Sequence, residues 1–201
     1  IINNTALVHD VTKAYSDFGA SGISVLTDTH FFGGSLDDLE IAVKNTMPVL
    51  RKEFIIDEFQ IIEAKAYGAS VILLIASCLT PAETKLLAGT AKALGMEVLL
   101  EIHDKTEMGH ISDEVDFVGV NNRSLKSFEV NIEHSLQLRS QLPKNKLSIA
   151  ESGIYDMATF QLLKKEGFDG FLMGEYFMKQ ADPAKAFELF ASQIKSNSNA
   201  I

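Results

Sequence analysis

The chain has little cysteine, little positive charge and no long apolar run, and each shortage excludes a class of protein. Its single cysteine, Cys78, cannot form a disulfide framework, and its place in the apolar run Val71 to Leu79 predicts a buried thiol. The longest uninterrupted apolar run, Val71 to Ala76, is far too short to cross a bilayer. Only 18 lysines and arginines stand against 27 acidic residues, so the net charge of -9 argues against a nucleic-acid-binding surface.

Motifs of several common enzyme classes are also missing. The sequence contains no G-x-S-x-G, no P-loop and no catalytic Cys/His signature. Its histidines lack metal-ligand spacing, which predicts that the protein has no metal site. These histidines are His9, His30, His103, His110 and His134. No signal peptide is visible and the first residue is not Met, so we expect a cytoplasmic protein with residues before residue 1.

What remains is the composition of an ordinary globular domain. The 201 residues are 46% hydrophobic and 22% charged, which is ample material for one core. No low-complexity segment or linker divides the chain. We therefore expect a single domain over residues 1–201.

The chain alternates between strand patterns and helix patterns. Strands are expected at seven short apolar runs: 23–27, 49–52, 71–75, 97–102, 117–120, 147–150 and 170–173. Helices are expected at 6–18, 35–45, 57–67, 80–94, 104–110, 131–140, 155–166, 174–178 and 183–194, with a frayed tail over 196–201. Short apolar strands separated by helices indicate parallel pairing and burial on both faces of the sheet.

Two α/β architectures fit this alternation. An open doubly wound sheet could hold seven strands, but the Gly-rich dinucleotide turn expected after the first strand is absent. The other architecture is a (β/α)8 TIM barrel, which is typically about 250 residues long. We favour the barrel, with seven of its eight strands in this chain. Because the chain opens on a loop-like stretch and then a helix, we expect the remaining strand before residue 1.

Three charged residues end alternate strands of the predicted barrel. Lys52, Glu101 and Glu151 follow the second, fourth and sixth strands, and inward side chains of such barrels form layers drawn from alternate strands. Period-two alternation gives each of them an apolar partner on the same face: Leu50, Leu99 and Ile149. The layer has a net charge of minus one, so we expect a second cation from the strand before residue 1.

A lysine beside carboxylates in a closed site is typical of acid–base catalysis. Lys52 lies in an apolar stretch, where it must find a partner or lose its proton. The alternative is a structural ion-pair network that fills the mouth of the barrel. Buried ion pairs are costly and are seldom retained for stability alone, which favours the catalytic interpretation.

The last two loops indicate a phosphate site. Ser152-Gly153 and Gly174-Glu175 follow the last two strands, where barrel enzymes commonly bind phosphate with backbone amides. Each glycine alone could serve a plain turn, and together they favour phosphate. The charge of Glu175 would oppose an anion unless its side chain points away.

Weaker signals come from two other loops. Asn121 can donate and accept hydrogen bonds, and Arg123 could clamp a carboxylate or phosphate, although Asn-Asn-Arg is also ordinary loop chemistry. The loop Phe31-Phe32-Gly33-Gly34 could cover an apolar ring of a substrate or simply pack.

The stretches ISVLTD…FFGGS, PVLRKEFIID, VLLEIHD, VGVNNRSL, IAESGI and GFLMGEYFM resemble indole-3-glycerol-phosphate synthases in order and spacing. The resemblance runs from about Ala6 to Phe190. It implies a lyase of tryptophan biosynthesis that closes the ring of 1-(2-carboxyphenylamino)-1-deoxyribulose 5-phosphate, releasing CO₂ and water to give indole-3-glycerol phosphate. It implies no cofactor and no metal.

The resemblance also assigns roles. It implies that Lys52 is the general acid, Glu101 its acid–base partner, and Asn121 and Glu151 residues that orient the substrate and support its charges. It implies a set of substrate- and phosphate-binding residues: Phe32, Phe54, Arg123, Ser152, Gly153, Gly174 and Glu175. Members of the family begin with a helix and a first strand that carries a glutamate and a second lysine, which we expect before residue 1.

Two other functions stay open at this point. One is a non-catalytic barrel that only binds phosphate, and the other is a different sugar-phosphate barrel enzyme, such as an isomerase. For this protein we expect a small phosphorylated substrate, no nucleic acid or membrane partner, and a monomer or weak homodimer.

Overall fold

Seven parallel strands pair in chain order, β1 to β7, in the computed structural model, which describes residues 2–124 and 128–198. The strands are β1 (Ile23–Leu26), β2 (Val49–Lys52), β3 (Val71–Ile75), β4 (Glu97–Ile102), β5 (Phe117–Asn121), β6 (Leu147–Glu151) and β7 (Gly170–Leu172). A doubly wound sheet would reverse its strand order at a switch point. The sequential order therefore excludes that alternative and confirms a (β/α)8-type barrel with seven strands present.

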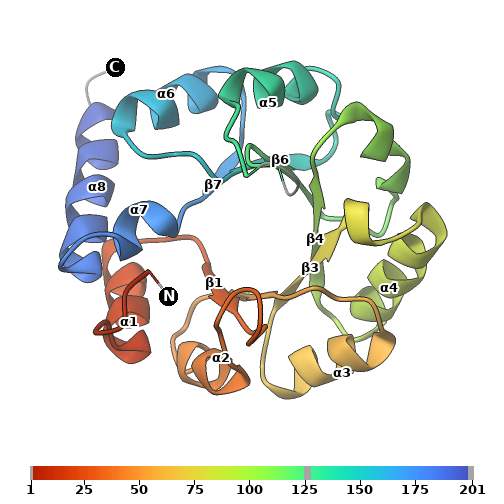
Figure 1. Ribbon diagram of the computed structural model, residues 1–201, viewed down its shortest axis with the longest axis horizontal. Coiled ribbons are helices and arrows are strands. Elements are labelled where there is room, and N and C mark those ends of the chain that lie inside the picture. The colour runs from red at the N-terminus through yellow and green to blue at the C-terminus, as the bar shows by residue number, and fades with distance from the viewer. Residues whose placement is uncertain (1, 125–127, 199–201) are drawn as a thin grey trace.

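Helices surround the strands in a ring (Figure 1). They are α1 (Val8–Phe18), α2 (Leu36–Ala42), α3 (Glu58–Ala66), α4 (Pro81–Ala93), α5 (Ile132–Arg139), α6 (Met157–Lys165), α7 (Glu175–Met178) and α8 (Pro183–Ser198). Two 3₁₀ turns, η1 (Ala76–Cys78) and η2 (Lys105–His110), follow β3 and β4. The first and last helices lie side by side (Figure 1). Tyr15 of α1 packs against Phe177 of α7 and Phe187 of α8.

Side-chain caps set where several helices begin. Asp57 and Gln60 form a reciprocal capping box at α3, and Thr80 and Glu83 form another at α4. Each box satisfies two backbone N–H groups that the first turn leaves without a partner. Ser35 caps α2 with a single hydrogen bond, accepting from the backbone amide of Asp38. The starts predicted at these three positions are confirmed.

The strand alternation divides the apolar side chains between two cores. Outward residues such as Val49, Ile72 and Leu100 pack against the helices. Inward residues form a smaller cluster inside the sheet: Leu50, Leu73, Ile75 and Leu99, with Ile149 and Phe54 against it. The predicted inward placement of Leu50, Leu99 and Ile149 is therefore confirmed. At the β1 edge the inward residues Ser24 and Leu26 are exposed.

Two expectations were wrong. Cys78 is exposed because β3 ends at Ile75 and the chain turns away from the sheet in η1. The apolar run that predicted a buried thiol thus spans both a strand and a surface turn. The expected fraying from Ser196 is also wrong up to Ser198, because α8 continues to that residue. The rest of the predicted tail lies outside the described residues.

No helix within residues 2–124 and 128–198 combines the length and the apolar character that crossing a bilayer requires.

Candidate active site

Lys52 lies between two buried carboxylates at the mouth of the barrel. Its Nζ is 3.3 Å from Glu101 Oε2 and 3.6 Å from Glu151 Oε2. Glu101 and Glu151 are each 1% exposed. The predicted layer from the ends of β2, β4 and β6 therefore forms, and Lys52 keeps its proton by pairing with both carboxylates.

The stagger of the strands brings these residues to one level of the barrel. Glu101 pairs with Gly119, which pairs with Ile149, so Glu151 lies two residues farther along β6 than the position in register with Glu101. Closing a sheet into a barrel requires such a stagger. Every second side chain at that level points inward. Asn121 donates to Glu101 Oε1 over 2.9 Å, and its own oxygen accepts from the amide of Arg123 over 3.0 Å. The amide is thereby held with its donor toward Glu101.

The three charges shift one another's pKa values. Burial lowers the pKa of Lys52, but the charges of Glu151 and Glu101 more than offset this and raise it. For Glu101, burial acts to raise the pKa, while Lys52 and the hydrogen bond from Asn121 prevail and lower it. Burial and the charge of Glu101 raise the pKa of Glu151 to about 8. The site thus holds an ammonium, a carboxylate and a carboxylic acid near neutral pH.

This protonation state balances the charge of the layer. With Glu151 neutral, the Lys52–Glu101 pair has no net charge, so the excess of minus one is removed by a proton. The second cation expected from residues before Ile1 stays a prediction.

The ionisation of Glu151 should couple stability to pH. Its carboxyl binds a proton more tightly in the folded protein than at its ordinary pKa of 4.5. Its contribution to the free energy of unfolding is therefore fully present below about pH 4.5 and is lost as the pH rises through about 8. We expect Glu151→Gln, which cannot ionise, to lose less stability than the parent protein between pH 6 and pH 9, conditions that span this ionisation.

Urea unfolding at the two pH values measures this difference. Glu40→Gln, at an exposed position of α2, is the control and should follow the parent protein. Parallel stability losses in all three proteins would show that Glu151 does not titrate in this range.

Gly119 provides the room that Glu151 occupies. A Cβ built on Gly119 would lie 1.9 Å from Glu151 Oε1, well inside any real contact. Gly119 lies on β5, two residues before Asn121, and so faces inward. The sequence alone does not indicate a role for this glycine, because the need for it arises from a side chain on the neighbouring strand.

Replacing Gly119 should therefore disturb the site more than the fold. We expect Gly119→Ala to push Glu151 away from Lys52, to cut turnover at least about tenfold, and to lower stability by about 1–3 kcal/mol, the usual range for overpacking. Gly89→Ala in α4 is the matched control, since a Cβ there meets nothing within 4 Å. Turnover near the parent value in Gly119→Ala would mean that the position of Glu151 is not critical.

The loop after β6 has an unusual backbone. Ser152 and Gly153 have φ values of 64° and 71°, so two consecutive residues lie in the left-handed region. Asn122 holds this loop, because its Nδ2 donates to the Ser152 carbonyl over 2.7 Å. The strain of a non-glycine residue at positive φ is often found at functional sites. Asn122 is a residue whose anchoring role the sequence did not reveal.

Glu175 is surrounded by partners that neutralise its charge. It forms an ion pair with Arg123, and its other oxygen is 2.6 Å from Lys179 Nζ. Tyr155 donates to it over 3.1 Å. Contacts with Lys179, Tyr155 and Arg123 lower the pKa of Glu175. The two adjacent cations, Arg123 and Lys179, therefore offset the negative charge that would otherwise repel an anion. Gly174 precedes it at the start of α7, with open space where a Cβ would stand.

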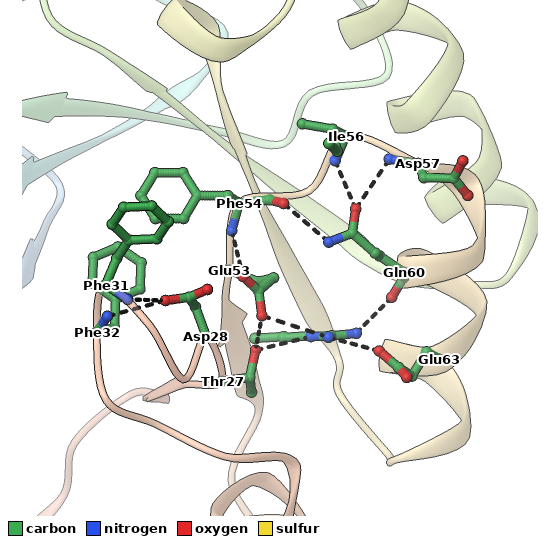
Figure 2. A network of polar contacts seen from close by, with 11 residues as sticks. Thr27, Asp28, Phe31, Phe32, Glu53, Phe54, Ile56, Asp57, Gln60 and Glu63 are labelled. Carbon is green, nitrogen blue, oxygen red and sulfur yellow. Dashed lines mark hydrogen bonds and ion pairs between the residues drawn. The ribbon is translucent and has the colours of Figure 1, made fainter.

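Aromatic rings from the loops that follow β1 and β2 pack against one another. Phe32 stacks on Phe54 with ring centroids 4.9 Å apart, and Phe31 approaches Phe54 edge-on at 5.6 Å. Asp28 holds the first loop by accepting from the amides of Phe31 and Phe32 (Figure 2). Of the two possibilities for this loop, packing is observed, and contact with a substrate ring stays a prediction.

A buried charge network between β2 and α3 holds the backbone amide of Phe54 (Figure 2). Arg51, which is 3% exposed, contacts Thr27 Oγ1, the Gln60 carbonyl and Glu63 Oε2. Glu53 accepts from Thr27 over 2.8 Å and from the amide of Phe54 over 2.9 Å. Arg51 points outward between β2 and α3, whereas its neighbour Lys52 points inward. This network was not predicted from the sequence, because a buried arginine is not expected on the helix side of a barrel.

The comparisons with known proteins agree with this geometry. The sequence model of the family described as indole-3-glycerol phosphate synthase matches residues 1–190. The chain belongs to the indole-3-glycerol phosphate synthase family. An indole-3-glycerol phosphate synthase of Bacteroides thetaiotaomicron is 42% identical over 195 residues, covering 96% of this chain and 75% of that protein. One of Campylobacter jejuni is 44% identical over 176 residues, covering 87% and 68%.

Solved structures similar to this chain confirm the fold. A crystal structure of 3-hexulose-6-phosphate synthase has a TM-score of 0.74 at 16% identity and covers 92% of each chain. KGPDC from Streptococcus mutans has a TM-score of 0.73 at 12% identity, covering 94% of this chain and 91% of its own. At such low identity these structures support the barrel architecture alone.

The structure brings most of the predicted site residues of this indole-3-glycerol phosphate synthase family member to one end of the barrel. Lys52, Glu101, Asn121 and Glu151 are in direct contact as a group, and Phe32 stacks on Phe54. Arg123 and Glu175 pair with each other in a second cluster, next to the loops of Ser152-Gly153 and Gly174. Within the described residues, no group of three or more histidine, cysteine or acidic side chains could hold a metal ion.

Proposed function

We propose that this protein closes the indole ring of 1-(2-carboxyphenylamino)-1-deoxyribulose 5-phosphate, with loss of CO₂ and water, to give indole-3-glycerol phosphate. Family membership supports this reaction. The observation that carries it is the contact of Lys52 with Glu101 and Glu151 in a nearly closed site, which supplies both a proton donor and a proton acceptor.

Lys52 is the general acid in this proposal. The ring carbon that bears the carboxylate attacks the ketone, and Lys52 delivers a proton to the ketone oxygen, which becomes a hydroxyl. The C–CO₂ bond then breaks, and its electron pair restores the aromatic ring. In the dehydration that follows, the hydroxyl leaves as water after a second protonation. The pairing that raises the pKa of Lys52 keeps the ammonium charged and ready to donate.

Glu101 is the partner base. It accepts a proton from the carbon next to the ring nitrogen during dehydration, since its lowered pKa keeps it ionised at neutral pH. Asn121 holds the Glu101 carboxylate in position. Glu151, protonated near neutral pH, donates a hydrogen bond to the substrate without adding charge. Each role matches an ionisation state that burial and neighbours produce.

The phosphate is proposed to bind at the loops after β6 and β7. Ser152 and Gly153 both have positive φ values, and backbone amides in such turns can form anion-binding concavities. Gly174 has free space on its Cα face. Arg123 and the stacked rings of Phe32 and Phe54 would line the sugar and the aromatic ring of the substrate.

Formation of indole-3-glycerol phosphate can be followed by fluorescence from the carboxyphenylamino substrate. We expect enzyme-like turnover with the full-length protein and none with buffer alone. Binding of the substrate without turnover would support the alternative of a barrel that only binds phosphate. Turnover of a simple sugar phosphate, with no indole product, would support a different sugar-phosphate enzyme.

A cytoplasmic location and a monomeric or weakly dimeric state belong to the same proposal. Both rest on the biosynthetic reaction and the small phosphorylated substrate, and no nucleic acid or membrane partner is involved. Cell fractionation and sedimentation velocity would test them.

A further inference from the structure

His103 is a buried histidine whose ring nitrogens have no hydrogen bond. It follows β4 directly, and its side chain is 14% exposed. Nε2 lies 3.4 Å from Glu101 Oε1, and Nδ1 lies 3.7 Å from Glu107 Oε2. A buried polar side chain without a hydrogen bond is rare enough in folded proteins to require an explanation. The ring is placed between two carboxylates that it approaches without binding either tightly.

The two oxygens of Glu101 face different proton carriers. Oε1 is approached by His103, and Oε2 by Lys52 at 3.3 Å. A proton that arrives at one oxygen of a carboxylate is shared with the other oxygen, so Glu101 connects the imidazole to the ammonium. Glu107 lies on the other side of the ring. Its side chain is 14% exposed, against 2% for Glu101, so Glu107 is the end of this connection that lies nearer to solvent.

The proposed reaction requires such a connection. Ring closure consumes one proton at the ketone oxygen, loss of the hydroxyl as water consumes another, and dehydration returns one from carbon. When the substrate carboxylate is ionised, one proton per turnover must therefore enter from solvent. Lys52 and Glu101 are nearly closed off from water, at 16% and 2% side-chain exposure, so that proton needs a carrier.

We propose that His103 is a relay residue that carries this proton from the solvent side at Glu107 to Glu101, and through it to Lys52. This inference rests on the proposed function. A proton taken up at Nδ1 makes the imidazole cationic. The Nε2–H bond then breaks, an O–H bond forms at Glu101 Oε1, and the ring becomes neutral again. Ring reorientation or exchange with water restores the starting tautomer.

The charges around His103 favour this role. Glu101 faces it from β4 and Glu107 from η2. Asp104, the N-cap of η2, acts on the charge of Glu107, and Lys52 of β2 contacts Glu101. From α5, His134 Nε2 lies 2.8 Å from the His103 carbonyl, and from η1, Cys78 experiences the charges of Glu101 and Glu107. Burial acts to raise the pKa of Glu107, but contacts with His103 prevail and lower it. Two carboxylates, Glu101 and Glu107, thus flank the ring.

The first test replaces His103 with glutamine, which keeps hydrogen-bonding capacity and does not titrate. We expect His103→Gln to reduce turnover about tenfold, less than the hundredfold typical of a direct proton donor, with added imidazole restoring part of the loss. The pH profile of turnover should also lose a slope between about pH 5 and 8, where histidine titrates. Parent-like turnover, or a loss that imidazole does not restore with an unchanged pH profile, would overturn the relay.

Two matched variants sharpen this test. Glu107→Gln, at the outer end, should lower turnover in the same direction. His9→Gln removes a histidine whose side chain is 71% exposed on α1 and should match the parent protein.

A second measurement separates failure of the relay from failure of the proposed function. Nuclear magnetic resonance of the labelled His103 ring reports the surroundings of the ring without any turnover. The relay requires contact between the ring and the Glu101 carboxylate, so the nitrogen shifts of the ring at a fixed pH should change in Glu101→Gln. Unchanged shifts would overturn the relay even in a protein without activity. Changed shifts in Glu101→Gln, together with a parent protein that forms no indole product, would contradict the proposed function and leave the His103–Glu101 contact established.

Discussion

Lys52→Met should reduce the formation of indole-3-glycerol phosphate at least about a hundredfold, the usual scale for loss of a positioned proton donor. Methionine keeps an unbranched stem of similar length and removes the charge. The ketone oxygen then loses its donor, while Glu101 and Glu151 lose the ammonium that lies 3.3 and 3.6 Å from them. Steady-state fluorescence at saturating substrate measures the effect.

The control separates lost catalysis from lost folding. Lys92→Met removes another lysine from an ion pair, since Lys92 lies 2.7 Å from Asp116 at a side-chain exposure of 40%. This surface pair should contribute little to stability, and turnover should remain at the parent level. Circular dichroism on both variants shows whether they fold. A folded Lys52→Met protein with parent-like turnover would exclude Lys52 as the general acid.

Glu101→Gln should have an effect of similar size, at least about a hundredfold on turnover. Glutamine fits the same space and can still accept from Asn121, but it cannot take a proton from the substrate carbon. We expect the loss in kcat, with a smaller change in KM, because the missing step is proton transfer and not binding. Fluorescence progress curves over a range of substrate concentrations separate the two constants.

Glu97→Gln is the matched control for this variant. Glu97 begins the same strand, β4, but is exposed at the opposite end of the barrel. It should leave both constants unchanged. If Glu101→Gln raises KM and leaves kcat intact, Glu101 binds substrate and another residue accepts the proton.

The two variants should not be additive. Lys52 and Glu101 are in contact and act as a unit. Removing either residue should already remove most of the rate enhancement that the two provide together. The double variant is therefore expected to be little slower than the worse single variant.

Most elements of the fold were predictable from local patterns. The strands Val49–Lys52, Val71–Ile75 and Glu97–Ile102 agree with the predicted boundaries. Short apolar runs between capped helices are a local signal, and parallel strands with both faces covered produce it. Cys78 shows the limit of such reasoning, because composition alone does not indicate where a strand ends and a surface turn begins.

The inward layer was also predictable, since alternation and strand ends are properties of the chain. Lys52, Glu101 and Glu151 were selected from their positions at the ends of alternate strands, before any distance was known. Their ionisation states were not predictable. The raised pKa of Glu151 depends on burial and on the distance to Glu101, which belongs to a strand two places away in the sheet.

The sequence by itself determined the alternation of strands and helices, the placement of Lys52, Glu101 and Glu151 at strand ends, and the family. Only the tertiary structure decided that Gly119 makes room for Glu151, that Glu53 and Arg51 hold Phe54, and that His103 lies between two carboxylates. The physical reason is that periodicity is read along one segment. Contacts, burial and charge coupling depend on distances between segments, which are set when the sheet curls and its neighbouring strands align.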